Sequence, residues 1–429
     1  MIRIYKQNEM SKEENKRIMQ RAQADIAAVK EKVAGIINDV RTNGDAALVK
    51  YTKMWDTEDF TAEKLRVTKE DIERTYENVA PNVLEQIKAQ IALAKKFHEA
   101  QRVNITDWEA ETAPGILVGE KWTPIEAVGL YIPGGKNPFP TVQQILALPA
   151  KIAGCPRIVA SVSPGSRIDE VLVAAAECGV DEIYRVGGAQ AIAAMAYGTE
   201  TIQPVNLIAG PGNPFVTAAK VLCQEKVAID MPAGPSEAIM LADEYADPRY
   251  CAADILARAE HGPDSAGVLV TDSDPLAEQV QAEVEKQFRA LSRQEYVREA
   301  LGRYSAIIVT ETWDDALSYV NAYAPEHVEL LVQNPRETLD QIVNAGSVFL
   351  GPTNPVATGD YASGVNHILP TGGWAKMTSP VGVWTFMKRV QYSEVSEEGL
   401  RSLQPIVDTI ADVEGLDAHR KSVDIRLED

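Results

Sequence analysis

A glutamate and a histidine stand side by side at Glu326 and His327, in the segment Ala324-Pro325-Glu326-His327. A carboxylate next to an imidazole could divide general acid–base work, because histidine exchanges protons near neutral pH. Pro325 restricts the backbone that leads into the pair. Taken alone, however, the pair is better explained as a glutamate at a helix end followed by a capping histidine. It is a candidate catalytic centre that needs independent support.

The other four histidines are spread along the chain. His261 closes a predicted helix and His419 lies near the C-terminus, while Asp360 lies in a glycine-containing loop. Two imidazoles and one carboxylate suit zinc, although their wide separation in sequence does not show that they meet. His98 is expected to be structural, on an amphipathic helix, and His367 is a further loop candidate.

Three glycine-containing loops follow predicted strands, at the place where parallel-sheet enzymes bind ligands. Each precedes a predicted helix, so free backbone N–H groups could meet phosphate oxygens. None matches GxGxxG or a Walker sequence, and tight turns alone would also explain the glycines. The loops are Tyr131-Ile132-Pro133-Gly134-Gly135, Gly187-Gly188-Ala189-Gln190 and Gly210-Pro211-Gly212-Asn213-Pro214.

The elements that must position these residues change along the chain. The first hundred or so residues repeat apolar side chains at three- and four-residue intervals, which predicts helices. From about Glu126, short apolar runs alternate with helical segments, and a second such series follows Ser236. This alternation predicts an α/β protein of two Rossmann-like lobes with parallel-type sheets, plus a helical N-terminal segment and a C-terminal tail.

Composition excludes several classes of function. A formal net charge of −20 and a pI near 4.8 argue against nucleic-acid binding, because phosphate contacts need basic surface. No apolar run approaches the roughly 18 residues of a membrane span, and the polar start carries no export signal. The four cysteines lack CxxC spacing. We expect a cytoplasmic protein with reduced thiols.

Several long segments also resemble the signature segments of the histidinol dehydrogenase family, in the family's order from Gly129 to Arg420. They are YIPGG, GGAQAIAAMAYGTE, GPGNPFVTAAK, PAGPSE, AEHGPDS, PEHVEL, NAGSVFLG, GDYASGVNHILPT and GLDAHR. The resemblance implies oxidation of the primary alcohol L-histidinol through the aldehyde to L-histidine, with two NAD+ and one zinc ion at each site. It also implies an intertwined homodimer with a small polar alcohol as substrate.

The resemblance assigns roles to individual residues. Glu326 would activate water for attack at the aldehyde stage, and His327 would accept the alcohol proton. The matching NAD contacts are Tyr131, Gln190 and Asn213, the zinc ligands are His261, Asp360 and His419, and the substrate contacts are Ser236, His327 and Glu414.

The predicted parts of the chain follow from this resemblance and from the alternation of elements. Residues 1–25 would form an N-terminal helical arm, and 26–128 with 237–378 a larger α/β domain. Residues 129–236 would form the NAD-binding Rossmann-like domain. The tail, 379–429, would complete the site of the partner subunit.

One residue departs from the family pattern. The family's fourth zinc ligand is a glutamine three residues before the histidine of AEHGPDS, and Arg258 stands there in this chain. The spacing keeps its side chain on the helix face of His261. A guanidinium has no lone pair for a metal. Three consequences are open: zinc on three protein ligands, weakened or lost metal binding, or an anionic substrate group that bridges Arg258 and the metal, with Lys136 as a second anion contact.

These consequences leave three hypotheses for the function. The first is histidinol oxidation, and the second is a paralogue that oxidises a small anionic alcohol such as 2,3-dihydroxypropane-1-sulfonate, with Arg258 as a substrate contact. The third is a catalytically silent binding protein, which the presence of Glu326 and His327 disfavours.

Overall fold

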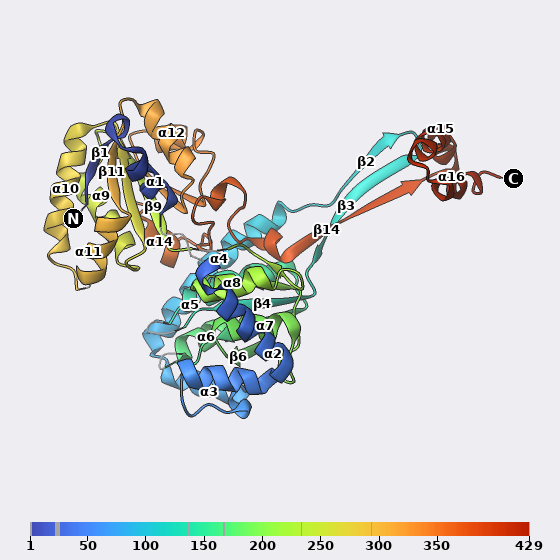
Figure 1. Ribbon diagram of the computed structural model, residues 1–429, viewed down its shortest axis with the longest axis horizontal. Helices are drawn as coiled ribbons and strands as arrows, with labels where there is room; N and C mark the ends of the chain where they lie inside the picture. Colours follow the sequence, from blue (N-terminus) through green and yellow to red (C-terminus); the bar gives the residue numbers. More distant parts are fainter. Residues whose placement is uncertain are drawn as a thin grey trace.

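Three sheets organise the chain in the computed structural model, which describes residues 2–21, 26–134, 138–165, 168–232, 234–292 and 294–428. Two of the sheets are parallel and lie in separate lobes, and the third is a long antiparallel ribbon (Figure 1). The predicted α/β class with two parallel-sheet lobes is therefore confirmed.

The first lobe contains a five-stranded parallel sheet in the order β6-β5-β4-β7-β8. Its central strand is buried along its whole length, as an apolar run between two layers of helices should be. The strands are β4 (Ala127–Ile132), β5 (Arg157–Val162), β6 (Glu182–Arg185), β7 (Leu207–Ala209) and β8 (Ala228–Ile229). The helices that connect them are α5 (Pro140–Ala153), α6 (Asp169–Glu177), α7 (Gly188–Tyr197) and α8 (Pro214–Leu222).

The long N-terminal helices also cover this sheet. Helix α2 (Ile26–Trp55) packs on α7 and α8, while α3 (Lys69–Asn78) and α4 (Pro81–Val103) pack against α5 and α6 on the other face. Val33, Val40 and Leu48 of α2 lie in the same core as the alanines of α7. The expectation that 26–128 joins 237–378 in one domain is therefore wrong for these helices. Their amphipathic pattern showed that they pack, but not against which sheet.

The second lobe contains a six-stranded parallel sheet in the order β1-β11-β10-β9-β12-β13. Alternate residues of β9 enter the cores on its two faces, Ala238 and Met240 on one and Ile239 and Leu241 on the other. The strands are β1 (Ile4–Lys6), β9 (Glu237–Ala242), β10 (Ala266–Thr271), β11 (Ala306–Val309), β12 (His327–Leu331) and β13 (Ser347–Leu350). Its helices are α1 (Lys12–Gln20), α9 (Pro248–Ala259), α10 (Asp274–Phe288), α11 (Gln294–Arg303), α12 (Trp313–Tyr323), α13 (Pro335–Leu339) and α14 (Val356–Tyr361).

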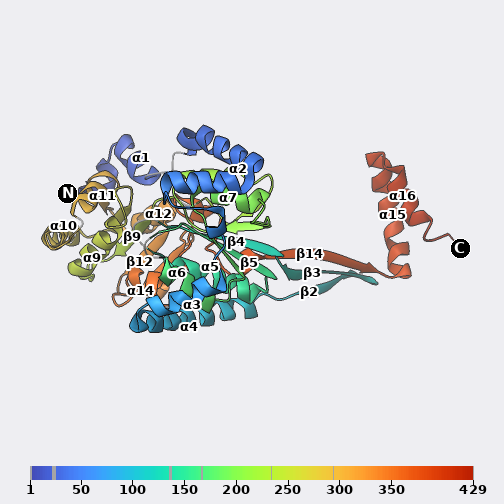
Figure 2. The same ribbon diagram turned by 90° about the horizontal axis from the view of Figure 1, so that it is seen from below.

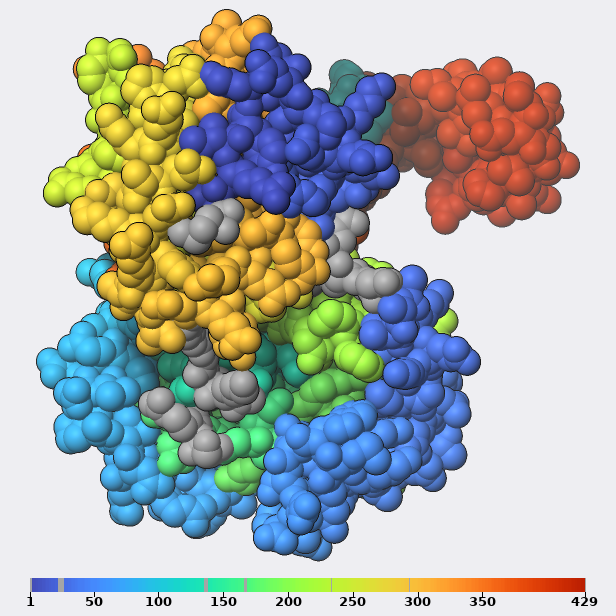
Figure 3. All heavy atoms as spheres, turned by 60° about the vertical axis from the view of Figure 1, so that its left-hand side comes forward, coloured from blue at the N-terminus to red at the C-terminus, as the bar shows by residue number. Residues whose placement is uncertain are grey.

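The start of the chain belongs to this second lobe. Instead of a separate helical arm, residues 4–6 form the edge strand β1, which pairs with β11. Helix α1 follows and buries Ile18 completely. In Figure 3 the dark-blue start of the chain lies on the yellow and orange lobe, whereas the lighter blue helices that follow cover the green one. The N-terminus thus ties itself to a sheet whose other strands come from the second half of the sequence.

The antiparallel ribbon extends away from both lobes and carries the C-terminal helices at its far end (Figures 1 and 2). It consists of β14 (Met387–Val395), β3 (Ile116–Pro124) and β2 (Trp108–Ala113), in that order. Helices α15 (Glu397–Glu414) and α16 (Asp417–Asp424) form the tip. The tail 379–429 is therefore not independent, because β14 needs β3 as its partner. The described segments also contain four short 3-10 helices: Gln7–Glu9, Ala62–Lys64, Trp374–Lys376 and Val383–Phe386.

No helix among the described segments combines the length and the apolar character that crossing a membrane requires.

A buried ion pair fixes the end of α1 to the central strand β9. The guanidinium of Arg21 meets both carboxylate oxygens of Glu237, with N···O separations of 2.6 Å to Oε2 and 2.8 Å to Oε1. Arg21 also donates to the carbonyls of Tyr323 and Ala324, and its guanidinium lies 3.5 Å from the centre of the Tyr323 ring. Three chain segments therefore meet at one buried cation: the end of α1, the start of β9 and the turn after α12.

Backbone strain gathers at the same place. Arg21 and Ala324 have φ of 53° and 51°, and they are the two non-glycine residues with positive φ in the described parts of the chain. Such conformations cost about 1–3 kcal/mol each and persist when the surroundings hold them. The Arg21 contacts supply that restraint, and the turn at Ala324 leads directly into Glu326.

We predict that Arg21→Met lowers the free energy of unfolding by about 3–5 kcal/mol, because it leaves the Glu237 carboxylate buried without its cation. Chemical denaturation of the purified protein measures the loss. The double variant Arg21→Met/Glu237→Gln should recover part of it, while Lys16→Met on the exposed face of α1 serves as the control. A single variant as stable as the control would contradict the role assigned to the ion pair.

Candidate active site

The two residues of the predicted acid–base pair lie at the amino end of the six-stranded sheet. His327 is the first residue of β12, opposite Ala238 of β9, and Glu326 precedes it. The segment that follows α14 packs onto the other lobe, since the Asn366 amide donates to the Ile145 carbonyl of α5 and Ile368 enters that lobe's core. The pair therefore lies where the amino end of one sheet approaches the neighbouring lobe.

A hydrogen bond to the backbone fixes the orientation of the His327 ring. Its Nδ1 lies 3.0 Å from the carbonyl oxygen of Glu237. A carbonyl only accepts, so Nδ1 carries the hydrogen and Nε2 keeps its lone pair. Nε2 is buried, has no hydrogen-bond partner in the described chain, and lies 3.8 Å from Oδ1 of Asp360. This nitrogen is available to take a proton from a ligand.

The carboxylate of Glu326 is held by two donors on one oxygen. Oε2 accepts from the Ser236 hydroxyl at 2.8 Å and from the Glu237 N–H at 2.9 Å. Burial by itself would raise the pKa of Glu326, but the neighbouring His327 ring, the Arg258 guanidinium and the Glu237 N–H together lower that pKa to about 2. Because both hydrogen bonds fall on Oε2, Oε1 can orient a water molecule.

Glu237 therefore positions both members of the pair, although sequence reasoning did not single it out. Its N–H holds Glu326, its carbonyl holds His327, and its side chain accepts from the N–H groups of Glu326 and Gly372 at 3.2 Å. Its place directly after Ser236 in PAGPSE was the available signal. Its function depends on strand pairing, which the sequence does not display.

A chain of polar contacts extends the site through Arg258. The guanidinium of this buried residue on α9 donates to Ser236 Oγ at 2.5 Å and meets Asp360 Oδ2 at 3.4 Å. Ser236 in turn donates to Glu326. The structure thus brings together four of the predicted site residues, Ser236, Arg258, Glu326 and Asp360, with His327 beside them.

Two further buried carboxyl groups, which the sequence did not indicate, lie near Arg258. Asp254 precedes it by one turn of α9, and Glu329 projects from β12 and accepts from the Val356 N–H at 2.7 Å. Burial raises the pKa of both carboxyl groups, and the nearby Asp254 raises that of Glu329 further. The hydrogen bond with Glu329 lowers the pKa of Asp254 in part, and Arg258 lowers both in part. The guanidinium therefore lies within a strongly acidic neighbourhood.

Two other histidines lie near this cluster. His261 follows α9 and interacts electrostatically with Arg258 and Asp360. His367 interacts electrostatically with Asp360, His327 and Glu326, and its Nε2 is buried without a partner among the described residues. The loop residue His367 is thus closer to the chemistry than its sequence context suggested. His98, by contrast, is buried in α4 and contacts Gln101, as expected for a structural histidine.

The loops expected to bind NAD lie at the carboxyl ends of the five-stranded sheet. The hydroxyl of Tyr131, at the end of β4, accepts from the N–H of Gly188, where α7 begins with a φ of +66°. Gln190 in the first turn of α7 is 1% exposed, and its Oε1 has no partner among the described atoms. A buried amide oxygen of this kind suits a ligand that brings a hydrogen-bond donor.

The third loop is built around a glycine that no other residue could replace. Gly210 has a φ of +133°, and a Cβ there would lie 2.2 Å from the Tyr131 carbonyl oxygen. Asn213 caps α8 by accepting from the N–H groups of Phe215 and Val216. Lys220, buried in α8, donates to the Gly210 carbonyl at 2.8 Å and pairs with Asp230. The close approach of the Gly210 backbone to Tyr131 and the N-termini of α7 and α8 together suit the phosphates of a dinucleotide.

Two predicted site residues lie far from this cluster within the same chain. Glu414 ends α15 and His419 lies on α16, both exposed at the tip of the ribbon and away from the lobes (Figures 1 and 2). Lys136 and Gly135 lie outside the described residues. The single chain therefore leaves the predicted set of substrate and zinc contacts incomplete.

The donor set does not fit a metal ion in the way the resemblance implies. Of the expected ligands within one chain, Asp360 is already engaged by Arg258. No group of three or more His, Cys, Asp or Glu side chains in the described segments is arranged to hold a metal. A cationic guanidinium stands where the fourth ligand would be, and it repels a second cation.

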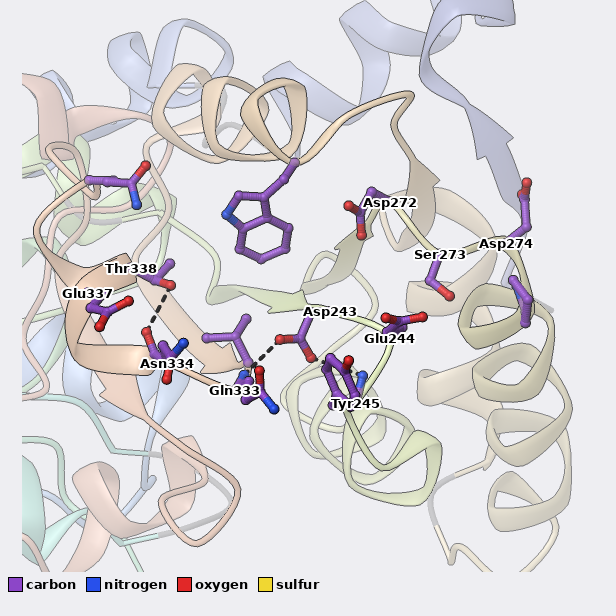
Figure 4. A pocket seen from close by; sticks show the side chains of 14 residues that line it. Asp243, Glu244, Tyr245, Asp272, Ser273, Asp274, Gln333, Asn334, Glu337 and Thr338 are labelled. Carbon is purple, nitrogen blue, oxygen red and sulfur yellow. Dashed lines mark hydrogen bonds between the residues drawn. The ribbon is translucent and has the colours of Figure 1, made fainter.

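A cavity of about 760 Å3 lies at the opposite, carboxyl edge of the six-stranded sheet. Asp243, Asp272 and Glu337 are among the residues that line it, together with Trp313, and the Asp243 carboxylate accepts from the Gln333 N–H (Figure 4). None of the predicted site residues belongs to it. Its size does not make it the active site, because the acid–base pair lies at the other end of these strands.

Comparison with known proteins agrees with the geometry. A model of the histidinol dehydrogenase family matches residues 19–427. The histidinol dehydrogenase of Methanothermobacter thermautotrophicus is 47% identical over 415 residues, which cover 96% of each chain. That of Vibrio parahaemolyticus is 45% identical over 423 residues, or 98% of this chain and 97% of the relative.

A solved structure shows that the likeness extends to the whole fold. The crystal structure of histidinol dehydrogenase from Elizabethkingia anophelis superposes with a TM-score of 0.93 at 36% identity, and it covers 99% of this chain and 98% of that one. The acid–base pair, the glycine loops and these matches together show that the chain belongs to the histidinol dehydrogenase family.

Proposed function

We propose that this protein oxidises L-histidinol to L-histidine in two successive NAD-dependent steps, through the aldehyde. The observation that carries the proposal is the pair itself: the buried Nε2 of His327 has no hydrogen-bond partner among the described residues, and it lies beside a Glu326 carboxylate held ionised. Relatives that share 45–47% of the sequence over nearly the whole chain bear the name histidinol dehydrogenase. Nothing in the structure or in these relatives favours the sulfonate alternative.

His327 and Glu326 would act at different stages of the reaction. In the first oxidation, His327 Nε2 takes the hydroxyl proton while the carbon loses hydride, which leaves the aldehyde. Glu326 then orients a water molecule for attack on the aldehyde carbon. After His327 has released its first proton to solvent, it takes a proton from the resulting hydrate as the carbon loses a second hydride. This gives the carboxylic acid, which then ionises in water to the carboxylate. The loops of Tyr131, Gln190 and Asn213 would hold NAD+, which would supply the hydride acceptor in both steps.

This division of work predicts different losses for two variants. With histidinol, wild-type protein should form two NADH per molecule, whereas Glu326→Gln should form the first NADH and release or retain the aldehyde. His327→Asn should lower both steps by about 10²–10⁴-fold. Stopped-flow absorbance at the NADH band and product analysis measure these quantities. Turnover of sulfonated or carboxylated diols but not of histidinol would refute the proposal, and absence of NADH with every alcohol would favour a silent binding protein.

The low pKa of Glu326 also predicts a pH dependence. A carboxylate with a pKa of about 2 loses its charge only as the pH falls toward 2, so it stays ionised over the whole working range. The acid limb of the kcat/KM profile, between about pH 5 and 8, must then come from another group. Glu326→Gln should lower the plateau without moving that limb, and Glu260→Gln on the nearby exposed helix end should change neither. A displaced acid limb in Glu326→Gln would contradict this assignment.

A second copy of the chain is proposed to complete each active site. The ribbon carries Glu414 and His419 away from the lobes, and the tip exposes an apolar stripe at helical spacing. Ile406, Ile410 and Val413 of α15 are 61%, 50% and 79% exposed. Such a surface is costly in water, and a two-fold exchange of tips between copies would cover it and deliver both residues. The homodimer predicted from the sequence is therefore part of this proposal. The cytoplasmic location predicted from the sequence is a separate proposal.

Mixing two inactive variants tests this exchange. Glu326→Gln disables the lobes of its own chain, and Glu414→Gln disables only the tip. If sites are shared, a refolded equimolar mixture contains heterodimers in which one of the two sites is intact, which gives about one quarter of wild-type activity. With activity measured as formation of histidine, each variant alone should stay inactive under the same treatment. No recovery in a mixture shown to contain heterodimers would place Glu414 in the site of its own chain, or outside any site.

A further inference from the structure

Arg258 lies at the centre of the charged groups of the site. Its side chain is 5% exposed, Nη1 donates to Ser236 at 2.5 Å, and Nη2 lies 3.4 Å from Asp360 Oδ2. The other oxygen of Asp360 faces Nε2 of His327 at 3.8 Å. One carboxylate therefore links the guanidinium to the residue that accepts the proton.

Several buried carboxyl groups share this one guanidinium. Glu326, Asp254 and Glu329 each interact electrostatically with Arg258, in addition to the direct contact with Asp360. Buried carboxylates need a nearby cation or a proton, since burial without either is strongly unfavourable. Arg258 provides this positive charge permanently, because a guanidinium does not lose its proton in a protein.

A metal ion at this place would compete directly with Arg258. It would need the oxygens of Asp360, one of which already faces the guanidinium, and it would lie next to a fixed positive charge. The guanidinium itself cannot serve as a ligand because it has no free lone pair. The residues that are present thus satisfy Asp360 with an organic cation rather than with an inorganic one.

We infer that Arg258 is the resident cation of this active site, and that the protein oxidises its alcohol without a bound metal ion. The part of this inference that concerns alcohol oxidation rests on the proposed function. The part that concerns the charges around Arg258 does not. It goes beyond that function, because it assigns to one side chain the electrostatic task that a divalent ion would otherwise perform.

Two buried atoms near Asp360 suit an alcohol group. Among the described residues, the donor Nε of Arg258 and the acceptor Nε2 of His327 both lack a hydrogen-bond partner. A hydroxyl group can satisfy both, because its hydrogen is donated to Nε2 and its oxygen accepts from the guanidinium. As the proton moves to His327, negative charge grows on that oxygen, and the nearby guanidinium stabilises it.

The test measures metal binding and turnover separately, on full-length protein produced in zinc-supplemented medium. Elemental analysis after dialysis, and calorimetric titration with ZnCl2 in the absence of substrate, give the zinc content and affinity. We expect far less than one zinc per wild-type chain and unchanged histidinol turnover after treatment with a chelator. Arg258→Gln should gain zinc affinity by at least about tenfold. Its turnover should become dependent on added zinc.

Two control variants separate charge from position. Arg258→Lys keeps a cation in place and should stay without zinc, while Arg249→Gln changes an exposed arginine of the same helix and should behave as wild type. The zinc content and zinc affinity of the wild-type protein test the inference even if a variant fails to fold. One tightly bound zinc per wild-type chain, with turnover lost on chelation and restored by zinc, would overturn the inference. Zinc-free protein without histidinol turnover would refute the proposed function while leaving the charge assignment intact.

Discussion

The buried carboxylate of Glu237 is the constraint on which the rest of the site depends. Its backbone fixes the orientation of both Glu326 and His327, so any shift of this residue moves the acid–base pair. Burial raises the pKa of its carboxyl group to about 7, because Arg21 offsets the loss of hydration only in part. Breaking that ion pair would leave a charge in the centre of the sheet.

The ion pair also anchors the N-terminal segment to one lobe before the chain continues to the other. Residues 2–21 add a strand and a helix to the six-stranded lobe, and residues from Ile26 onward cover the other lobe. Arg21 stands at the end of the first of these segments. Its strained backbone is stabilised where the turn at Ala324 delivers Glu326. The contacts of Arg21 therefore serve two purposes. They hold the turn that leads to Glu326, and they fix the end of the segment that connects the two lobes.

The two sheets contribute to the site from opposite ends. Ligand loops in parallel sheets usually follow the carboxyl ends of strands, and Tyr131, Gly188 and Gly210 obey that rule in the five-stranded lobe. The six-stranded lobe contributes the amino ends of β9 and β12 instead. The cofactor loops can thus be supplied by one lobe and the proton-transfer groups by the other. The arrangement also explains why the cavity near Asp243 is distant from the chemistry.

The sequence by itself determined the local features. Apolar periodicity established the α/β class and the alternation of strands and helices in the two lobes, and residue chemistry marked Glu326, His327 and the glycine loops. The substitution at Arg258 was also visible, because a guanidinium has the same donor chemistry in any fold. Local spacing was sufficient for these conclusions, since each depends on neighbours within one element or turn.

Only the tertiary structure decided which distant segments meet. The pairing of β1 with β11, the packing of α2 on α7 and the ribbon of β2, β3 and β14 join residues tens to hundreds of positions apart. An amphipathic face shows that a helix must pack but not on which sheet, and a strand pattern does not name its neighbour. Glu237 and Arg21 were missed for that reason. Their importance lies in one long-range ion pair, and the charge of Arg258 gained its meaning from the carboxylates that folding placed around it.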